Sequence, residues 1–403
     1  MKLTRTSLLG MIALTFLLGC DSTQRNGYML HPDLGARYGL KENPLNKNGY
    51  DWWWHSLVAR RRTSGELQPF FIEYYVINPG LGGKEPIFGQ LPENKAAGIK
   101  PSYAMLKAGT WVKDGAVQIH NFYGIDDFSA ALERMDVRIG PNIATDTLLR
   151  GSVGLSPQAV ADHPEYMSQS GYMSWDLKVI KDLSYSVGYA ASEFFTTLNA
   201  FSMWWHIPGM KARYKGTITY NGETYDVIPE QSYGYQDKNW GSEYTNPWVW
   251  LNCNNFTSER SGLPLPMTSL DIGGGAPEAF GIPLGKKVLV ILYHEGRLYE
   301  FNFSKIWKLS KQHFDVEIGE DAITWNVVAQ NGDEKLEINF SNPKDKMLKV
   351  NYENPRGEWN HRELWNGGHA AGTVKLYHRI QGRWQWIDTL HGSLGGSEFG
   401  AYR

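Results

Sequence analysis

The most distinctive chemical segment of the chain is the run 233–241, which reads Tyr-Gly-Tyr-Gln-Asp-Lys-Asn-Trp-Gly. In a strand, Asp237 and Asn239 point to one face and Lys238 and Trp240 to the other, because side chains alternate. A carboxyl group buried among aromatic rings has a raised pKa, since burial disfavours its charged form. Asp237 could then hold a proton near neutral pH and act as an acid. The alternative is a turn in which Asp237 caps backbone amides and Trp240 plugs the end of a barrel.

Aromatic side chains are the second distinctive feature, at 13% of the chain with 16 Trp and 22 Tyr. Trp and Tyr combine an apolar body with a polar tip, so they suit both strand cores and pockets for flat or greasy ligands. Most of them are expected in the core. Because side chains alternate along a strand, one Trp of each neighbouring pair should face a cavity. The residues expected to line a ligand pocket are Trp53, Trp54, Tyr75, Trp205, His206, Trp248 and Trp250.

Other kinds of site have no matching pattern in the sequence. The 11 His residues show no metal-binding spacing such as His-Glu-x-x-His, so no metal site is expected. The triplet Gly273-Gly274-Gly275 lacks the following helix and Lys of a phosphate loop, and is more typical of a rim turn. A formal net charge of -2 provides no basic field for nucleic acid.

Turn signals recur along the chain and predict an antiparallel β protein. Asn221-Gly222, Glu295-Gly296 and Gln381-Gly382 each separate two runs in which apolar and polar residues alternate. Pairs of this kind accept the positive φ values that two-residue hairpins require. Helix signals are few, and Ser156-Pro157 opens one short helix that runs to about His163.

Equal spacing in the two halves favours two successive barrels. Seventeen residues separate Trp54 from Phe71, and the same number separate Trp250 from Met267. Chance similarity between two hairpins is the alternative. Each half is long enough for a barrel that encloses a small cavity. We therefore expect a mostly β chain with few short helices, a first antiparallel barrel over residues 49–228 and a second over 229–403.

The N-terminus indicates export. Lys2 and Arg5 precede an apolar stretch that is too short to span a bilayer comfortably. Leu17-Leu18-Gly19-Cys20 then resembles the lipobox of bacterial lipoproteins, with plain secretion as the alternative. The expected parts are a signal peptide over residues 1–19, a lipidated Cys20 and a polar tether over residues 20–48. These features predict a membrane-anchored lipoprotein of the bacterial cell envelope.

The central run resembles the signature of tocopherol cyclases, in which Glu-Lys-Asn-Trp-Gly leads into an aromatic strand that ends in Cys-Asn. Here Gln-Asp-Lys-Asn-Trp-Gly at 236–241 is followed by Pro-Trp-Val-Trp-Leu-Asn-Cys-Asn at 247–254. The early Trp strand, the Val-Ile-Asn-Pro turn at 76–79 and the hairpin at 293–301 are similar in the same order. Asp237 stands where the family has Glu. The resemblance extends from about Tyr50 to the C-terminus.

This resemblance implies two lipocalin-like barrels, a fold shared with carotenoid 1,2-hydratase-like proteins. It also implies chemistry on a prenylated quinol, in which an alkene of the isoprenoid tail is protonated and the phenol oxygen closes a chromanol ring. No cofactor or metal is implied. Asp237, Asn239 and Trp240 would form the catalytic group, with Asp237 donating the proton and Trp240 stabilising the cation.

A binding protein is the second hypothesis. Two barrels held near a membrane could carry an isoprenoid, a quinone or another lipid. A buried carboxyl group facing the cavity would favour an enzyme, whereas a wholly apolar cavity would favour a carrier. In both cases the expected partners are a hydrophobic small molecule and, through the lipid anchor, a membrane.

Overall fold

The computed structural model describes residues 24–25, 28–29, 49–112, 115–131, 134–185, 203–279, 282–303, 309–359 and 363–401. These described residues are nearly all β, with 65% of them in strands and two short α-helices. The expected signal peptide, Cys20 and most of the expected tether lie outside the described residues, so lipidation and export remain predictions. No described helix combines the length and the apolar character needed to cross a bilayer.

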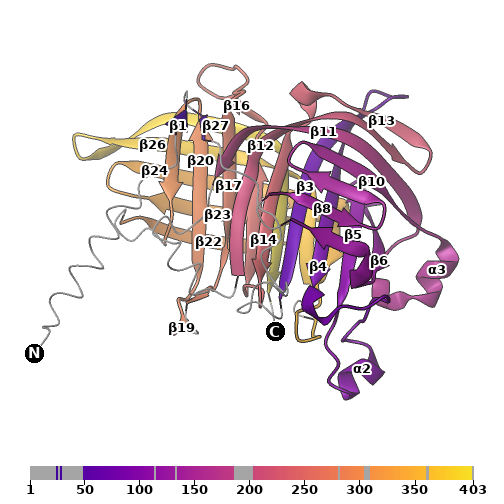
Figure 1. The fold of residues 1–403 in the computed structure, drawn as a ribbon. Coiled ribbons are helices and arrows are strands. Elements are labelled where there is room, and N and C mark those ends of the chain that lie inside the picture. Colours follow the sequence, from indigo (N-terminus) through magenta and orange to yellow (C-terminus); the bar gives the residue numbers. More distant parts are fainter. Residues whose placement is uncertain are drawn as a thin grey trace, which may run out of the picture.

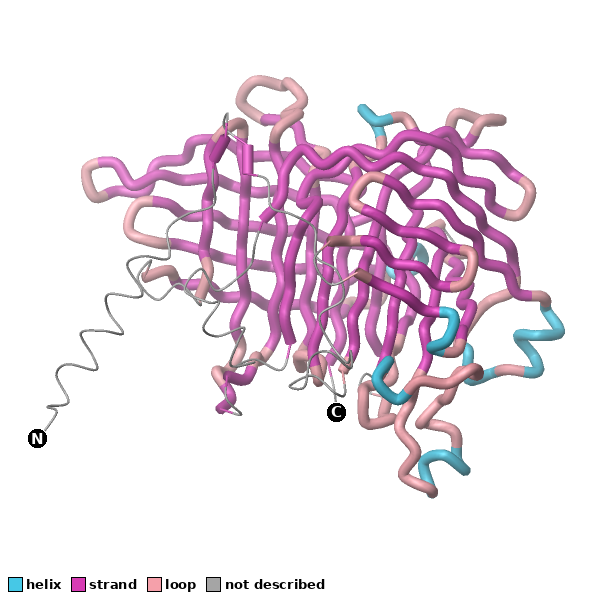
Figure 2. The backbone as a smooth tube through the Cα atoms, in the orientation of Figure 1, coloured by secondary structure: helices cyan, strands magenta, loops and turns pink. Residues whose placement is uncertain are grey.

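The first half forms one antiparallel sheet of 12 strands that curls over on itself (Figures 1 and 2). β14 (Gly234–Gly241) is inserted between β3 and β12 and pairs with both. The remaining strands follow the order β6 (Val117–Tyr123), β5 (Tyr103–Thr110), β4 (Leu67–Ile77), β3 (Tyr50–Arg61), β13 (Glu223–Val227), β12 (Met203–Tyr220), β11 (Gly171–Tyr185), β10 (Leu148–Leu155), β9 (Asn142–Thr145), β8 (Asp136–Ile139) and β7 (Phe128–Ala130).

The second half forms a separate sheet of 11 strands, drawn in orange and yellow in Figure 1. Two short strands leave its main path, since β16 (Phe256–Ser258) pairs with β27 and β25 (Met347–Val350) pairs with β26. The main order is β21 (Arg297–Phe301), β20 (Lys287–His294), β17 (Thr268–Gly275), β15 (Trp248–Cys253), β27 (Arg383–Ala401), β26 (Glu363–Ile380), β24 (Glu334–Pro343), β23 (Ala322–Gln330) and β22 (Lys311–Ile318).

The remaining elements are short. Two two-stranded ribbons pair β1 (Gln24–Arg25) with β2 (Tyr28–Met29) and β18 (Glu278–Ala279) with β19 (Ile282–Pro283). Within the described residues the helices are α2 (Pro92–Ala96), α3 (Pro157–Asp162) and the 3-10 turns η1 (Pro79–Leu81), η2 (Ile125–Asp127), η3 (Pro164–Tyr166), η4 (Pro229–Gln231) and η6 (Lys344–Lys346).

The local signals in the sequence act as expected. Asn221 and Gly222 adopt positive φ values of 45° and 85° and connect β12 to β13. Gln381 and Gly382 do the same between β26 and β27. Ser156 caps α3, because its hydroxyl accepts a hydrogen bond from the Ala159 amide at 3.1 Å. The expected antiparallel fold with two barrel-like halves is confirmed.

The change of sheet does not coincide with the expected boundary at 228/229. β14 follows that boundary, yet it pairs with β3 and β12 of the first sheet. The second sheet begins only at β15, so the sheets change between Gly241 and Trp248. A buried ion pair adds to this pairing of β14 with the first half, since Lys238 of β14 pairs with Asp51 of β3.

Three clusters of buried side chains form the core. One lies within the first half and includes Trp53, and another lies within the second half and includes Cys253. The third joins the two halves and contains Trp54 and Tyr75 from the first and Trp248 and Trp250 from the second. The middle of the molecule is therefore an aromatic layer shared by both halves.

Candidate active site

The alternation of side chains along β14 divides its residues between two of these clusters. Asp237 lies directly across from Trp54 of β3, and Asn239 lies across from Trp205 of β12. Directly opposed residues of an antiparallel pair share one face of the sheet. Asp237, Asn239, Trp54 and Trp205 therefore face the aromatic layer between the halves.

Lys238 and Trp240 of the same run face the first-half core. Lys238 lies across from Trp53 and from His206, and its ammonium group sits 4.0 Å from the Trp53 ring centroid. Trp240 shares this face, with its ring 5.4 Å from the same ammonium group and stacked on Trp204 at 6.3 Å. The expected division of the run is confirmed, and it places Trp240 away from Asp237.

Asp237 is 5% exposed and its two carboxyl oxygens have different surroundings. Oδ2 accepts hydrogen bonds from Trp205 Nε1 at 2.9 Å, from the Tyr235 hydroxyl at 3.2 Å and from Asn239 Nδ2 at 3.4 Å. Oδ1 is buried without a hydrogen-bond partner among the described residues. A proton on this carboxyl group therefore belongs on Oδ1, because Oδ2 already accepts three hydrogen bonds.

Burial raises the pKa of Asp237 to about 7, and the nearby Glu398 carboxylate contributes in the same direction. The hydrogen bonds from Trp205, Tyr235 and Asn239 oppose this rise, because they stabilise the charged form. A substantial share of the protein therefore carries a neutral Asp237 acid near neutral pH. This is the state that proton donation to a weak base requires.

A second buried carboxyl group, Asp271, reaches the same place from the second half. It is fully buried, and neither of its oxygens makes a hydrogen bond among the described residues. Burial raises its pKa well above the ordinary range, and the charge on Asp237 raises it further. The Tyr235 hydroxyl and the Trp250 indole oppose that rise, so both lie near the Asp271 carboxyl group although neither forms a well-aligned hydrogen bond. Each half thus contributes one buried acid.

One face of β17 explains how Asp271 is positioned. Ser269, two residues earlier on the same face, donates a hydrogen bond to the Met210 carbonyl of the first half at 2.7 Å. Gly273, two residues later, packs under the Trp205 ring, and a Cβ added there would lie 2.3 Å from that ring. The Gly triplet expected as a rim turn is part of this strand, and its first member gives Trp205 room to reach Asp237.

Aromatic rings enclose the two acids. The Trp250 indole donates a hydrogen bond to the Tyr235 hydroxyl at 3.3 Å and meets the Trp54 ring edge-on, with centroids 6.3 Å apart. Trp248 meets Trp52 edge-on at 6.1 Å. The faces of aromatic rings attract positive charge, by roughly 1–2 kcal/mol for each ring when the site is desolvated.

The other buried acids of the aromatic layer already have partners. Glu73 forms an ion pair with Lys107 and accepts a hydrogen bond from the Tyr352 hydroxyl at 3.1 Å. Glu398 accepts hydrogen bonds from Trp248 Nε1 and Asn366 Nδ2, both at 2.6 Å. Glu73 also keeps one oxygen, Oε1, without a donor, but it forms an ion pair with Lys107, and both oxygens of Glu398 accept hydrogen bonds. Among the described residues, Asp237 and Asp271 have neither an ion pair nor a donor for every oxygen.

A small cavity of about 60 Å³ is lined by neighbours of the acids, although neither Asp237 nor Asp271 is itself part of its lining. Three of its lining residues are hydrogen-bonded to Asp237 or to its neighbour Tyr235. Trp205 and Asn239 donate to Asp237, and Trp250 donates to the Tyr235 hydroxyl. Trp248 lines it too. No group of three or more His, Cys, Asp or Glu side chains within the described ranges could hold a metal ion.

The structure gathers most of the expected site residues and separates three of them. Asp237, Asn239, Trp54, Trp205 and Trp250 meet around the acids, and Tyr75 and Trp248 belong to the same aromatic layer. The residues on the opposite face of the sheet are Trp53, His206 and Trp240.

Two residues of this site, Tyr235 and Asp271, were absent from the site residues expected from the sequence. Tyr235 could have been found from the two-residue period, because it precedes Asp237 by two positions on the same strand. Asp271 has no local signal, since only the packing of one half on the other brings it close. Cys253 lies in the second-half core, where burial raises the pKa of its thiol to about 12.

Comparison with known proteins gives related sequences from plants. Over 137 residues the chain is 28% identical to "Tocopherol cyclase, chloroplastic" of Zea mays, which covers 34% of this chain and 26% of that protein. Over 86 residues it is 29% identical to "Probable tocopherol cyclase, chloroplastic" of Oryza sativa subsp. japonica, covering 21% and 17%. The aligned segments thus span about a quarter or less of the length of these relatives.

Two solved structures are similar at low sequence identity. A protein described as AttH from Nitrosomonas europaea has a TM-score of 0.42 and 11% identity, covering 93% of this chain and all of that one. CghA, solved with Sch210972, has a TM-score of 0.44 and 11% identity, covering 89% of each chain.

A family model gives the broadest match. The model described as "Tocopherol cyclase-like" matches residues 116–401, which include β14, β15 and β17 and therefore both buried acids. Because this match covers well over half of the sequence, the chain belongs to the tocopherol cyclase-like family.

Proposed function

We propose that the protein closes a ring in a prenylated quinol by protonating an alkene of its isoprenoid tail. The observation that carries this proposal is the neutral acid at Asp237, which is buried between aromatic walls with one oxygen free of protein donors. Family membership supports the same class of substrate. The reaction is an isomerisation, so it needs no oxidant, reductant or second substrate.

The proposed sequence of steps uses Asp237 first as an acid and then as a base. Asp237 Oδ1 gives its proton to one alkene carbon, and the other carbon becomes a tertiary cation. The phenol oxygen then forms the new C–O bond, and its proton returns to the Asp237 carboxylate. An alkene is a very weak base, so the donor must be neutral and shielded from water, as the buried carboxyl group is.

The surrounding groups have distinct parts in this proposal. Trp54, Trp205 and Trp250 present rings to the cation and keep water from trapping it. Asp271 remains neutral and offers its carboxyl group to the phenol hydroxyl as a hydrogen-bond partner. Tyr235 connects the two acids, because it donates to Asp237 and lies near Asp271.

A prenylated quinol is larger than the cavity of about 60 Å³ beside the acids. Its ring can therefore enter only if side chains at the cavity wall move. Met203, Thr245 and Phe303 form part of this wall, together with the glycines of β17. The glycines add no side chains that would block such a movement.

The carrier hypothesis is less well supported by this site. A carrier needs apolar walls, and buried carboxyl oxygens without partners lower its stability by about 1–3 kcal/mol each. The two neighbouring acids at the centre of the molecule therefore support catalysis over storage.

Isotope incorporation tests the proposed reaction. The purified protein would be incubated with a phytyl-substituted quinol in D2O, and the product analysed by mass spectrometry after back-exchange in H2O. The proposal requires a chromanol with one deuterium bound to carbon, because the proton comes from an acid that exchanges with solvent. A chromanol without carbon-bound deuterium would refute alkene protonation. Recovery of unchanged quinol would favour the carrier.

A further inference from the structure

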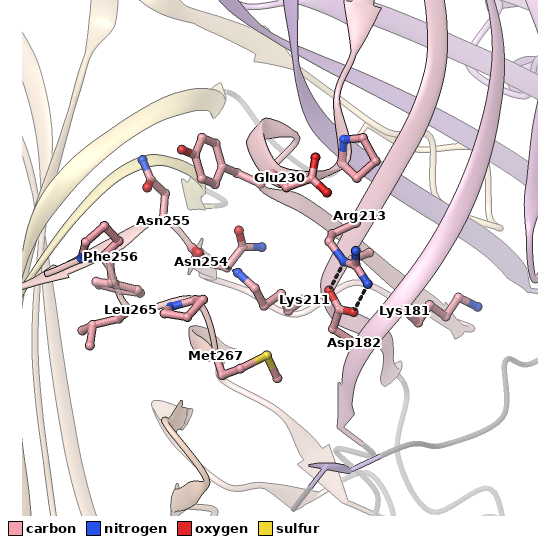
Figure 3. A pocket seen from close by; sticks show the side chains of 15 residues that line it. Lys181, Asp182, Lys211, Arg213, Glu230, Asn254, Asn255, Phe256, Leu265 and Met267 are labelled. Atoms are coloured by element: carbon pink, nitrogen blue, oxygen red, sulfur yellow. Dashed lines mark hydrogen bonds and ion pairs between the residues drawn. The ribbon is translucent and has the colours of Figure 1, made fainter.

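A cleft of about 820 Å³ opens between the two halves, apart from the cavity beside the acids (Figure 3). The first half contributes Lys181 and Asp182 of β11 and Lys211 and Arg213 of β12. The second half contributes the segment 254–256 and the segment 264–267. The cleft is within the size range of typical ligand pockets.

Strand alternation directs two cations into this cleft. Ala212 and Tyr214 of β12 point into the first-half core. Lys211 and Arg213 alternate with them and therefore point the other way, toward the second half. The register between β11 and β12 shifts between Lys181 and Leu183, which turns Asp182 toward the same space.

The two cations have different partners. Arg213 forms a two-point ion pair with Asp182, at 2.8 and 2.9 Å. Lys211 extends toward Asn254 across the cleft (Figure 3). Its ammonium group donates one hydrogen bond, to the Asn254 main-chain oxygen at 3.0 Å. No carboxylate of the described residues lies within ion-pair distance of its ammonium group, which has three N–H donors. Burial also lowers the pKa of Lys211, because it removes water from the charge.

The rest of the cleft wall combines polar residues of the first half, among them the carboxylate of Glu230, with an apolar surface on the second half. Phe256, Leu265 and Met267 lie on the second-half side near Lys211, as Figure 3 shows, and Pro264 and Pro266 flank Leu265. A partly buried cation beside an apolar wall is complementary to a molecule with an anionic head and an apolar chain.

We propose that this cleft binds an amphipathic anion, whose head group pairs with Lys211 and whose chain lies against Phe256, Leu265 and Met267. The site is separate from Asp237 and the inference does not depend on the proposed ring closure. A carboxylate and a phosphate head share the required chemistry, and the binding experiment distinguishes them.

Calorimetric titration of the full chain with oleate, oleyl phosphate and oleyl alcohol, each below its aggregation limit, tests the proposal. We expect at least one of the two anions to bind about 10-fold or more tightly than the alcohol, which has the same chain but no charge. The anion that binds more tightly identifies the preferred head group. Equal affinity for the alcohol and both anions would overturn the proposal.

Variants of two lysines on β12 locate the site. Lys211→Met keeps the apolar stem and removes the charge, so anion affinity should fall about 10-fold while alcohol affinity is unchanged. The unchanged alcohol affinity guards against a folding defect in Lys211→Met, and Lys211→Arg, which keeps the charge, should retain anion binding. Lys215→Met removes an exposed charge from the same strand and should have no effect. Wild-type anion affinity in Lys211→Met would overturn the assignment.

Discussion

At the level of single residues, the asymmetry of the Asp237 carboxyl group is the feature most directly tied to chemistry. One oxygen accepts three hydrogen bonds, and the other has no protein donor in the described structure. Burial raises the pKa to about 7, and these three hydrogen bonds oppose the rise. Burial and the three donors therefore together set the pH at which the acid loses its proton.

Replacing Trp205 with Phe tests this control of the pKa. The indole hydrogen bond stabilises the carboxylate, so its loss should raise the pKa of Asp237 above about 7. Turnover that requires the neutral acid falls as pH rises through the pKa, and the alkaline limb of the pH–rate profile should move to higher pH in Trp205→Phe. The partly exposed Trp386→Phe serves as the control. An unmoved limb would show that Asp237 does not control the profile.

The sequence could predict much of this residue-level picture. The two-residue period of a strand correctly separates Asp237 and Asn239 from Lys238 and Trp240. The same period argues against Trp240 as a partner of Asp237, because the two point to opposite faces. Asp271 could not be predicted in this way, since no local pattern reports which residues of another sheet pack nearby.

At the level of elements, two strands bring the acids together. β14 is held in the first sheet by its pairing with β3 and β12, and β17 presents its Asp271 face from the second sheet. Hairpin signals predicted several strand connections, such as those at 221–222, 295–296 and 381–382, because two-residue turns depend on local φ values. They could not predict that β14 returns to the first sheet, which depends on the buried contact between Lys238 and Asp51.

The close packing of Gly273 against Trp205 gives an element-level prediction. The Cβ of Gly273→Ala would lie 2.3 Å from the buried ring, so the ring or the strand must shift. We expect a loss of about 1–3 kcal/mol in the free energy of unfolding, measured by denaturant titration, because overpacking forces such shifts. Gly332→Ala is the matched control, since nothing lies within 4 Å of its added Cβ. Equal stability of the two variants would contradict the packing described for β17.

At the level of the whole molecule, polar contacts fasten one half to the other around the aromatic layer. Oε1 of Glu353 in the second half accepts a hydrogen bond from the main-chain N–H of Gln90 in the first half at 2.6 Å. Its main-chain oxygen accepts one from the Tyr75 hydroxyl at 3.4 Å. Sequence spacing predicted two halves but not this shared layer, because contacts between distant segments leave no periodic signal.

The pH dependence of stability should report on Glu353. Burial raises its pKa from the ordinary 4.5 to about 8, so the folded protein keeps a proton that the unfolded chain loses above its own pKa. The contribution of this proton to the free energy of unfolding is complete below about pH 4.5. It falls by about 1.4 kcal/mol per pH unit above that value and is lost as the pH rises through about 8. Denaturant titrations at about pH 5 and about pH 8 should therefore show a smaller pH effect in Glu353→Gln than in the wild type. The exposed Glu66→Gln is the control, and an identical pH effect in all three proteins would refute the role of Glu353.

The most direct test of the central claim compares ring closure by Asp237→Asn with that of the wild type. The amide keeps the shape of the side chain and much of its hydrogen bonding, but it has no acidic proton. Turnover of a phytyl-substituted quinol should fall by about 100-fold or more, with thermal unfolding close to that of the wild type. Asp176→Asn, which alters an exposed Asp on β11, should retain full turnover. Undiminished turnover by a folded Asp237→Asn protein would contradict the claim that Asp237 donates the proton.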